Sequence, residues 1–260
     1  MWLATERDGH GVEQAHAAVD AGADLVLSLG GDGTIRQVLS AVEGRAAVGV
    51  LPAGSGNLLA KNLRIPLDIG RAMDLALDSP ATPLDLLLIE ADGAAPTVAA
   101  VMVGAGADAA VLADTSERGK RLVGPLAYIS AGLRHIVATP VAAEVIVGGE
   151  VISVDTSLVT VGNVGSLHPG VALMPAADPA DGRLEVLVAS PEGAVDVLRM
   201  ILGVLAGRDR IDDVVRLSGV EVTARFERPV AFHVDGDVVG DVTVVRATVL
   251  PGAARVVRPG

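Results

Sequence analysis

Two glycine-rich segments near the start of the chain contain the residue types that bind phosphate. The first is Gly30-Gly31-Asp32-Gly33-Thr34, which lies between an apolar run and an amphipathic one. Glycines let backbone N–H groups approach phosphate oxygens, and the start of a following helix adds partial positive charge. Asp32 would repel phosphate unless it faced a hydroxyl or a metal ion, which suggests Mg²⁺. Taken alone, such a segment is more often a plain tight turn between a strand and a helix.

The second segment, Gly54-Ser55-Gly56-Asn57, follows one strand–helix unit later. In a parallel sheet both segments lie at the carboxyl ends of their strands, which meet at one edge where ligands bind. Two such loops in one crevice favour a nucleotide site over two unrelated turns.

The elements that position these loops alternate in the first eighty residues. Apolar runs at 24–29 and 48–51 predict buried strands, and the spacing of Ile35, Val38, Leu39 and Val42 predicts one face of a helix. Further helices are expected at 12–21, at 57–63 with Asn57 as its cap, and at 68–77 with Asp68 as its cap. This alternation predicts an open parallel sheet in an α/β domain.

The pattern changes after residues 78–83, which contain two prolines. Beyond them, short runs with turn signals, including Gly148-Gly149, predict a mostly antiparallel β-rich sandwich. The expected strands are 84–89, 97–103, 142–147, 151–154, 157–161, 184–189, 220–226, 230–234 and 242–249, and the expected helices are 125–138 and 192–206. We therefore predict domains at 1–83 and 84–250, with residues 251–260 returning to the first domain.

Composition excludes several classes of function. The net charge is −12, from 20 basic and 32 acidic residues, which argues against nucleic acid as a partner. The absence of cysteine excludes disulfides and thiolate sites and suits a reducing cytoplasm. The first residues do not resemble a signal peptide, and the longest uncharged run, 93–107, is too short to span a membrane. We expect a soluble, cytoplasmic protein.

The glycine segments belong to a longer pattern. Residues 30–35 and 49–66 closely resemble the catalytic domain of the diacylglycerol and sphingosine lipid kinase family. Further similar segments follow in the family's order at 103–108, 174–182 and 233–237. The resemblance spans nearly the whole chain and implies a first domain like those of phosphofructokinase and NAD kinase.

The resemblance implies a role for each matching residue. Asp235 resembles the general base that takes a proton from the lipid hydroxyl as it attacks the γ-phosphate of ATP, although Asp235-Gly236-Asp237 also has the pattern of a plain hairpin turn. The residues implied to bind ATP are Thr5, Gly30, Gly31, Asp32, Gly33, Thr34, Gly54, Ser55, Gly56, Asn57 and Asp237.

Two further carboxylates are implied to bind substrate or metal. Asp108 matches a position near the acceptor lipid, with a helix cap as the alternative. Asp181 matches a position near bound Mg²⁺, with an Asp-Gly turn as the alternative. The implied partners are ATP and a membrane-derived lipid, and a homodimer remains open. Residues 118–121, which are basic, precede an apolar stretch at 122–129, a pairing that suits transient membrane contact or a solvated loop before a core helix.

The chain departs from the family pattern at three places. Ser55 replaces the usual Thr, and Asp237 replaces the usual Glu. The family's first strand, its Asn-Pro-x-Ser-Gly turn and the next helix are missing before Trp2. Either the sequence begins late, the interpretation we favour, or one wall of the ATP site is lacking. The alternative functions are a soluble-substrate kinase of the NAD kinase type and a degenerate module that binds nucleotide or lipid without activity.

Overall fold

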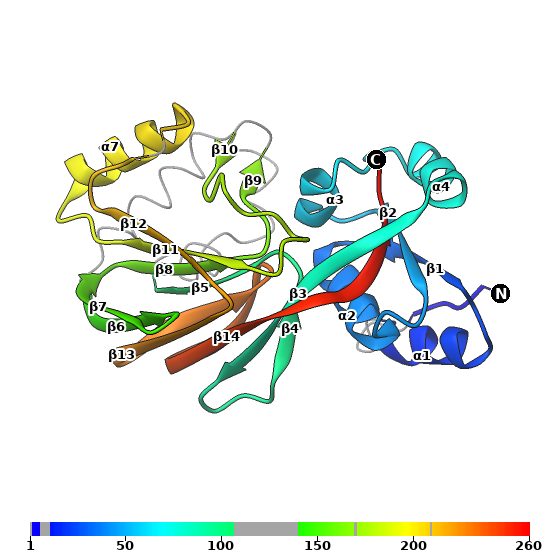
Figure 1. The fold of residues 1–260 in the computed structure, drawn as a ribbon, viewed down its shortest axis with the longest axis horizontal. Helices are drawn as coiled ribbons and strands as arrows, with labels where there is room; N and C mark the ends of the chain where they lie inside the picture. Colours follow the sequence, from blue (N-terminus) through cyan, green and yellow to red (C-terminus); the bar gives the residue numbers. More distant parts are fainter. Residues whose placement is uncertain (1, 6–10, 107–139, 169–170, 209) are drawn as a thin grey trace.

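The computed structural model describes residues 2–5, 11–106, 140–168, 171–208 and 210–260. These residues form two lobes, which Figure 1 shows side by side, with the N-terminal elements in the right-hand lobe. Two long strands, drawn in cyan and red, run from one lobe into the other. The fold is an α/β domain followed by a β-sandwich, as the sequence predicts.

The N-terminal lobe alternates helices and strands. Its elements are α1 (Val12–Asp20), β1 (Leu25–Gly30), α2 (Asp32–Val42), β2 (Ala47–Pro52), α3 (Leu58–Asn62) and α4 (Ile69–Asp78). β1 and β2 are parallel, with Leu25 opposite Ala47. Within the described residues β1 pairs with β2 alone, and its side chains Leu27 and Leu29 are exposed. β1 is therefore an edge of the sheet in this part of the chain.

The two predicted helix caps behave differently. The Asp68 side chain accepts a hydrogen bond from the Arg71 amide, so this cap at the start of α4 is confirmed. Asn57 occupies the N-cap position of α3, as predicted, but its side chain makes no capping bond to this helix. Asp32 from the first glycine loop supplies a side-chain acceptor instead, for the Leu59 amide at 3.0 Å. The cap of α3 thus comes from 27 residues earlier in the chain.

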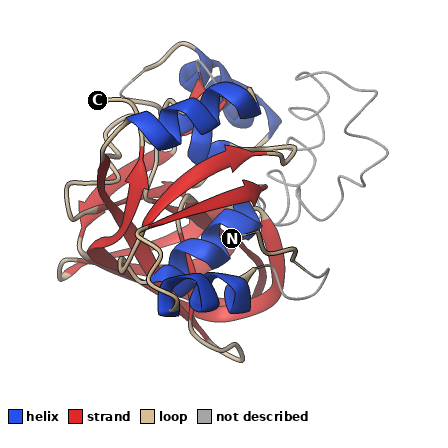
Figure 2. Cartoon of the chain, turned by 90° about the vertical axis from the view of Figure 1, so that its right-hand side faces the viewer, coloured by secondary structure: helices blue, strands red, loops and turns tan. Residues whose placement is uncertain are grey.

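The C-terminal lobe is built mainly from antiparallel strands. They are β3 (Ala81–Ala91), β4 (Thr97–Ala99), β5 (Met102–Gly106), β6 (Val141–Val147), β7 (Glu150–Thr156), β8 (Leu158–Gly162), β9 (Ser166–His168), β10 (Val171–Ala172), β11 (Leu184–Ala189), β12 (Val214–Gly219), β13 (Glu221–Val234) and β14 (Asp237–Val257). One helix, α7 (Ala194–Leu205), lies between β11 and β12. Figure 2, in which the N-terminal lobe faces the viewer, shows helices on both sides of the strands of that lobe. The predicted hairpin at Gly148-Gly149 is confirmed between β6 and β7, with both glycines at positive φ.

β13 and β14 are longer than the sequence predicts. The predicted strands 220–226 and 230–234 are one strand with an irregularity between Arg225 and Val230. β14 pairs with β13, then with β3, and near its end with β2 in parallel, where Val256 lies opposite Val48. The last segment of the chain therefore lies in the sheet of the N-terminal lobe (Figure 1). The domain boundary after residue 83 stays a prediction.

Other predicted elements need correction. The expected strand 97–103 is interrupted at residues 100–101, between β4 and β5. The strands β9, β10 and β12 were not expected, since β12 has a mixed pattern and the other two are very short. The expected helix 125–138 lies outside the described residues.

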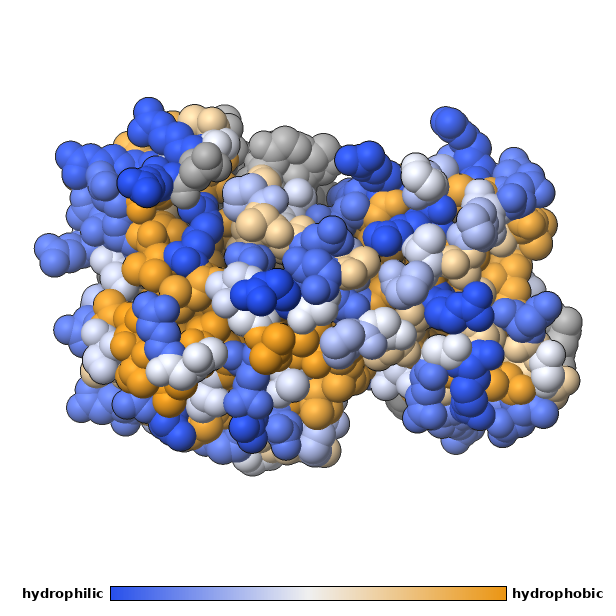
Figure 3. Space-filling model, viewed as in Figure 1, coloured by the Kyte–Doolittle hydropathy of each residue, from blue (hydrophilic) through white to orange (hydrophobic). Residues whose placement is uncertain are grey.

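Aliphatic side chains fill two clusters, one centred on α2 and β2 and the other between the strands of the C-terminal lobe. The four predicted apolar positions of α2 (Ile35, Val38, Leu39 and Val42) are buried. Figure 3 shows apolar patches on both lobes within a largely polar surface. Among the described residues no helix has the length and apolar character needed to cross a bilayer.

Candidate active site

The two glycine loops touch each other. A Cβ built on Gly54 would lie 2.4 Å from Cα of Gly31, a distance that real Cβ atoms do not show. Because β1 and β2 are parallel and adjacent, their carboxyl ends deliver both loops to the same edge of the sheet. The sequence predicts this convergence, and only glycine at position 54 permits so close an approach of the two backbones.

Two side chains fix the shape of these loops. Asn57 lies in the left-handed region, with φ 49°, and is buried. Its Oδ1 accepts from the Gly54 amide at 2.9 Å, and its Nδ2 donates to the Gly54 carbonyl at 2.8 Å. Asp32 crosses between the loops to the Leu59 amide, and its Oδ2 lies close to Gly56. In this structure the side chains of Asn57 and Asp32 therefore hydrogen-bond to backbone groups and fix the conformation of the second loop and the start of α3.

A third segment, the hairpin Val234–Asp237, meets the first loop. Asp235 and Gly236 have φ 49° and 91°, the two left-handed residues that a tight two-residue hairpin requires. A Cβ on Gly33 would lie 3.1 Å from Oδ2 of Asp237, so this carboxylate lies against the first turn of α2. The structure thus brings residues 30–34, 54–57 and 234–237 together, although they come from both lobes.

The Asp235 carboxylate is anchored by backbone amides. Its Oδ1 accepts from Val101 and Met102, both at 2.9 Å, and its Oδ2 accepts from Ala100 at 2.8 Å. These amides lie at the interruption between β4 and β5, which explains why the predicted strand breaks there. Since a carboxylate oxygen has two acceptor sites, Oδ2 keeps one for a further donor.

Opposing effects act on the pKa of Asp235. Burial raises its pKa above the ordinary aspartate value, because a charged group is poorly solvated there. The amide hydrogen bonds and the positive charge of Arg36 act in the opposite direction, and burial prevails. A carboxylate with a raised pKa is a stronger base once it is deprotonated.

A buried polar network continues from this site, and sequence reasoning missed it. Asn163 donates from Nδ2 to the carbonyls of Ala100 and Asp85, at 3.0 and 2.7 Å. The Asp85 carboxylate accepts from the Gly182 and Gly252 amides, both at 2.7 Å. One feature of the sequence could have indicated this network: Asp85 is the single charged residue in the aliphatic run Leu84–Ile89. A charge in a buried strand needs hydrogen-bond partners.

The remaining predicted residues lie elsewhere or are not described. Thr5 is exposed and lies beside Gly11 at the start of α1. Asp181 is exposed, and its Oδ1 accepts from the Arg183 amide at 2.8 Å, the geometry of a local turn. Asp108 and the basic segment 118–121 lie outside the described residues.

The part of the chain that is described does not contain a group of three or more His, Asp or Glu side chains that could hold a metal ion. Asp181 bonds within its own turn, and one oxygen of Asp32 is taken by the Leu59 amide. These carboxylates do not assemble a Mg²⁺ site by themselves, so we derive no step through a metal ion.

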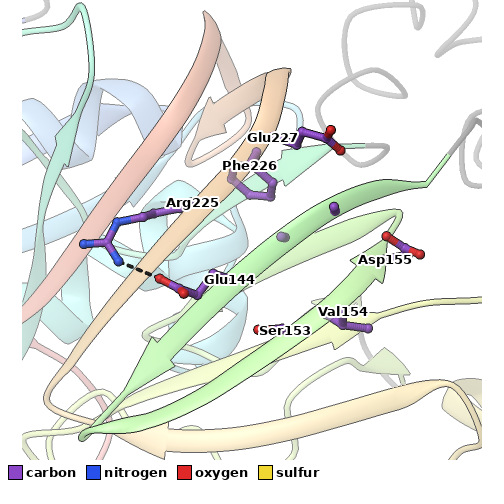
Figure 4. A pocket seen from close by; sticks show the side chains of 9 residues that line it. Glu144, Ser153, Val154, Asp155, Arg225, Phe226 and Glu227 are labelled. Atoms are coloured by element: carbon purple, nitrogen blue, oxygen red, sulfur yellow. Dashed lines mark hydrogen bonds and ion pairs between the residues drawn. The ribbon is translucent and has the colours of Figure 1, made fainter.

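A groove of about 590 Å³ lies apart from the glycine loops, between β6, β7 and β13. Figure 4 shows an ion pair in its lining between Glu144 and Arg225, which lie on neighbouring strands with their charged atoms 2.7 Å apart. Asp155 and Glu227 add further negative charge to its lining. Such a lining repels phosphate, so the groove does not suit a nucleotide.

Comparisons with known proteins agree with this geometry. Residues 2–89 match the model of the diacylglycerol kinase catalytic domain, and residues 101–258 match the YegS C-terminal NAD kinase beta sandwich-like domain. A "Probable lipid kinase YegS-like" protein of Pseudomonas fluorescens is 31% identical over 253 residues, which cover 93% of this chain and 80% of that protein. The chain belongs to the family of YegS-like lipid kinases and diacylglycerol kinases.

Two other similar proteins are named diacylglycerol kinases. The "Diacylglycerol kinase" of Mycobacterium tuberculosis is 28% identical, over 94% of this chain and 79% of that protein. A crystal structure of a diacylglycerol kinase from Bacillus anthracis superposes with a TM-score of 0.73 at 18% identity, covering 99% of this chain and 84% of that one. At that identity the superposition establishes the shared fold.

Proposed function

We propose that this protein transfers the γ-phosphate of ATP to the hydroxyl of diacylglycerol or a related membrane lipid. The observation that carries the proposal is the meeting of three segments: two glycine loops in backbone contact, and a hairpin with a buried carboxylate against them. Family membership supports a lipid as the acceptor, and the net charge of −12 argues against nucleic acid.

In the proposed reaction the glycine loops bind ATP. The N–H groups of residues 30–34 and 55–57 bind its phosphates, aided by the start of α2, while the Gly54 amide stays bonded to Asn57. Asp235 accepts the proton of the lipid hydroxyl on Oδ2 while the hydroxyl oxygen attacks the γ-phosphorus, and ADP leaves. The three amides that anchor Asp235 keep its carboxylate in one orientation. ATP is a substrate here, and any Mg²⁺ would enter with its phosphates.

Asp235→Asn tests the assignment of the base. Asn tolerates the left-handed backbone at this position, and its side-chain oxygen can still accept from the Val101 and Met102 amides, while the bond from Ala100 is lost. Since a general base contributes about 10²–10⁴-fold, the rate of transfer from ATP to lipid should fall by at least about 10²-fold. Calorimetric titration should still detect ATP binding. The matched control is Asp74→Asn on the exposed face of α4, which should keep full activity.

The assay should offer ATP with a panel of diacylglycerol, monoacylglycerol and sphingosine in mixed micelles, and NAD in solution. Full activity in Asp235→Asn would refute the base. Phosphorylation of NAD and of none of the lipids would favour the soluble-substrate alternative. ATP binding without transfer to any acceptor would favour a degenerate binding module.

A further inference from the structure

Arg36 is a charged side chain that is 92% buried between the two lobes, its exposed fraction being 8%. It lies in the second turn of α2, directly after the first glycine loop. A buried cation is costly unless it is paired or hydrogen-bonded, so its partners indicate why this residue is there.

Both partners of Arg36 lie on the hairpin of the other lobe. Nη1 donates to the Val234 carbonyl at 3.3 Å, and Nη2 donates to Oδ2 of Asp237 at 3.1 Å. The guanidinium therefore bonds to the residue before the two turn residues, Val234, and to the residue after them, Asp237. It does so from the helix whose first turn, at Gly33, already contacts Asp237.

The same hairpin is held from its other side. The Asp235 side chain is bonded to the amides of residues 100–102, and its own amide donates to the Met102 carbonyl at 2.9 Å. Arg36 thus fixes one side of the hairpin to the glycine loop, and residues 100–102 fix the other side to the sandwich. Together they set where the Asp235 carboxylate lies relative to the glycine loops.

We propose that Arg36 is a positioning residue for phosphoryl transfer, which holds the hairpin 234–237 against the glycine loop so that Asp235 faces the bound nucleotide. This inference rests on the proposed function. A purely stabilising role fits the contacts less well, because Asp237 is 61% exposed on its side chain and such an ion pair contributes little to stability. The positive charge of Arg36 opposes the rise in the pKa of Asp235 that burial causes.

The test compares Arg36→Leu and Arg36→Lys with Arg225→Leu. Arg225 is a matched control, because it lies on β13 and also pairs with a carboxylate, that of Glu144. In Arg36→Leu we expect kcat to fall by about 10²-fold, as small misplacements of a reacting group do, with ATP affinity nearly unchanged. Arg36→Lys should restore part of kcat, and Arg225→Leu should leave it unchanged.

The pH dependence gives a second readout. Among the described residues, the charge that acts on Asp235 is that of Arg36 on α2; His233 on β13 and Asp237 flank it in the sequence, and residues 100–102 contribute backbone amides. Loss of the cation raises the pKa of Asp235, so the acid limb of the rate profile should move to higher pH in Arg36→Leu. A variant that merely loses folded protein would keep the limb in place.

Hydrogen exchange tests the inference without turnover. In Arg36→Leu the amides of Ala100, Val101 and Met102 should exchange at least about tenfold faster, because the hairpin that covers them is held from one side only. Exchange and kcat that both match the wild type would overturn the proposal, as would a loss of activity explained by unfolding alone. Absence of lipid phosphorylation in the wild type would refute the proposed function, and exchange would still decide whether Arg36 holds the hairpin.

Discussion

The contact between the two glycine loops predicts a large effect from adding one methyl group, in Gly54→Ala. The new Cβ would lie 2.4 Å from Cα of Gly31 and 3.0 Å from Oδ1 of Asn57. The first of these atoms is backbone and cannot rotate away. Gly54 is not among the glycines at positive φ, so alanine adds no backbone strain and the whole effect is steric.

The size of this effect follows from two opposing terms. Overpacking a tight contact destabilises the folded protein by about 1–3 kcal/mol. Replacing glycine by alanine stabilises it by about 0.4–1 kcal/mol, because alanine restricts the unfolded chain. The free energy of unfolding should therefore fall by about 1–2 kcal/mol. For a protein of this size, about 2–4 °C in Tm corresponds to each kcal/mol, so Tm should fall by roughly 2–8 °C.

Two measurements check the prediction: thermal unfolding by calorimetry, and titration with ATP. Because the loops must separate, their N–H groups no longer converge, and the Kd for ATP should rise by at least about tenfold, or about 1.4 kcal/mol. Gly193→Ala is the control, since its backbone is extended, with φ −177°, and its Cβ would meet nothing within 4 Å. If Gly54→Ala unfolds and binds ATP like this control, the loops are not in contact in solution.

Two further predictions concern carboxylates outside the loops. Asp85→Ala leaves the Gly182 and Gly252 amides without their acceptor, so urea denaturation should give a loss of about 2–5 kcal/mol, and an unchanged midpoint would contradict the network. Hydrogen bonds from the Thr243 hydroxyl, and from nearby amides, hold the pKa of Asp92 below its usual value. A lowered pKa stabilises the folded protein above the usual aspartate range, and this is lost as pH falls through the lowered value. The wild type should therefore be slightly more stable than Asp92→Asn at neutral pH, and the two proteins should be equally stable in acid. A difference in stability that does not change with pH would refute this pairing.

Local patterns in the sequence determined much of the fold. The alternation of strands and amphipathic helices predicts β1, α2 and β2, because burial of one face follows a fixed period. Turn residues predict the hairpins at Gly148-Gly149 and at Asp235-Gly236, since few residues adopt positive φ. The meeting of the two glycine loops also follows from sequence, because adjacent parallel strands end at one edge.

The predictions that failed depend on partners distant in the chain. Asn57 stands at the N-cap position of α3, yet the side chain that accepts from the first turn of this helix is that of Asp32 from another loop. The strand 97–103 breaks because three of its amides turn to Asp235, more than 130 residues later. A side chain can satisfy backbone groups anywhere in the fold, and the sequence gives no distance between them.

For the candidate site, too, some features follow from the sequence and others only from the folded structure. From the sequence, the residue types of the glycine loops predict phosphate binding, and the resemblance to the lipid kinase family predicts Asp235 as the base. Only the tertiary structure decided how Asp235 is held, and that Arg36 joins the hairpin to the glycine loop from 198 residues away. The physical reason is that burial makes an unpaired charge costly, so the partner of Arg36 is selected by what encloses it in the folded chain.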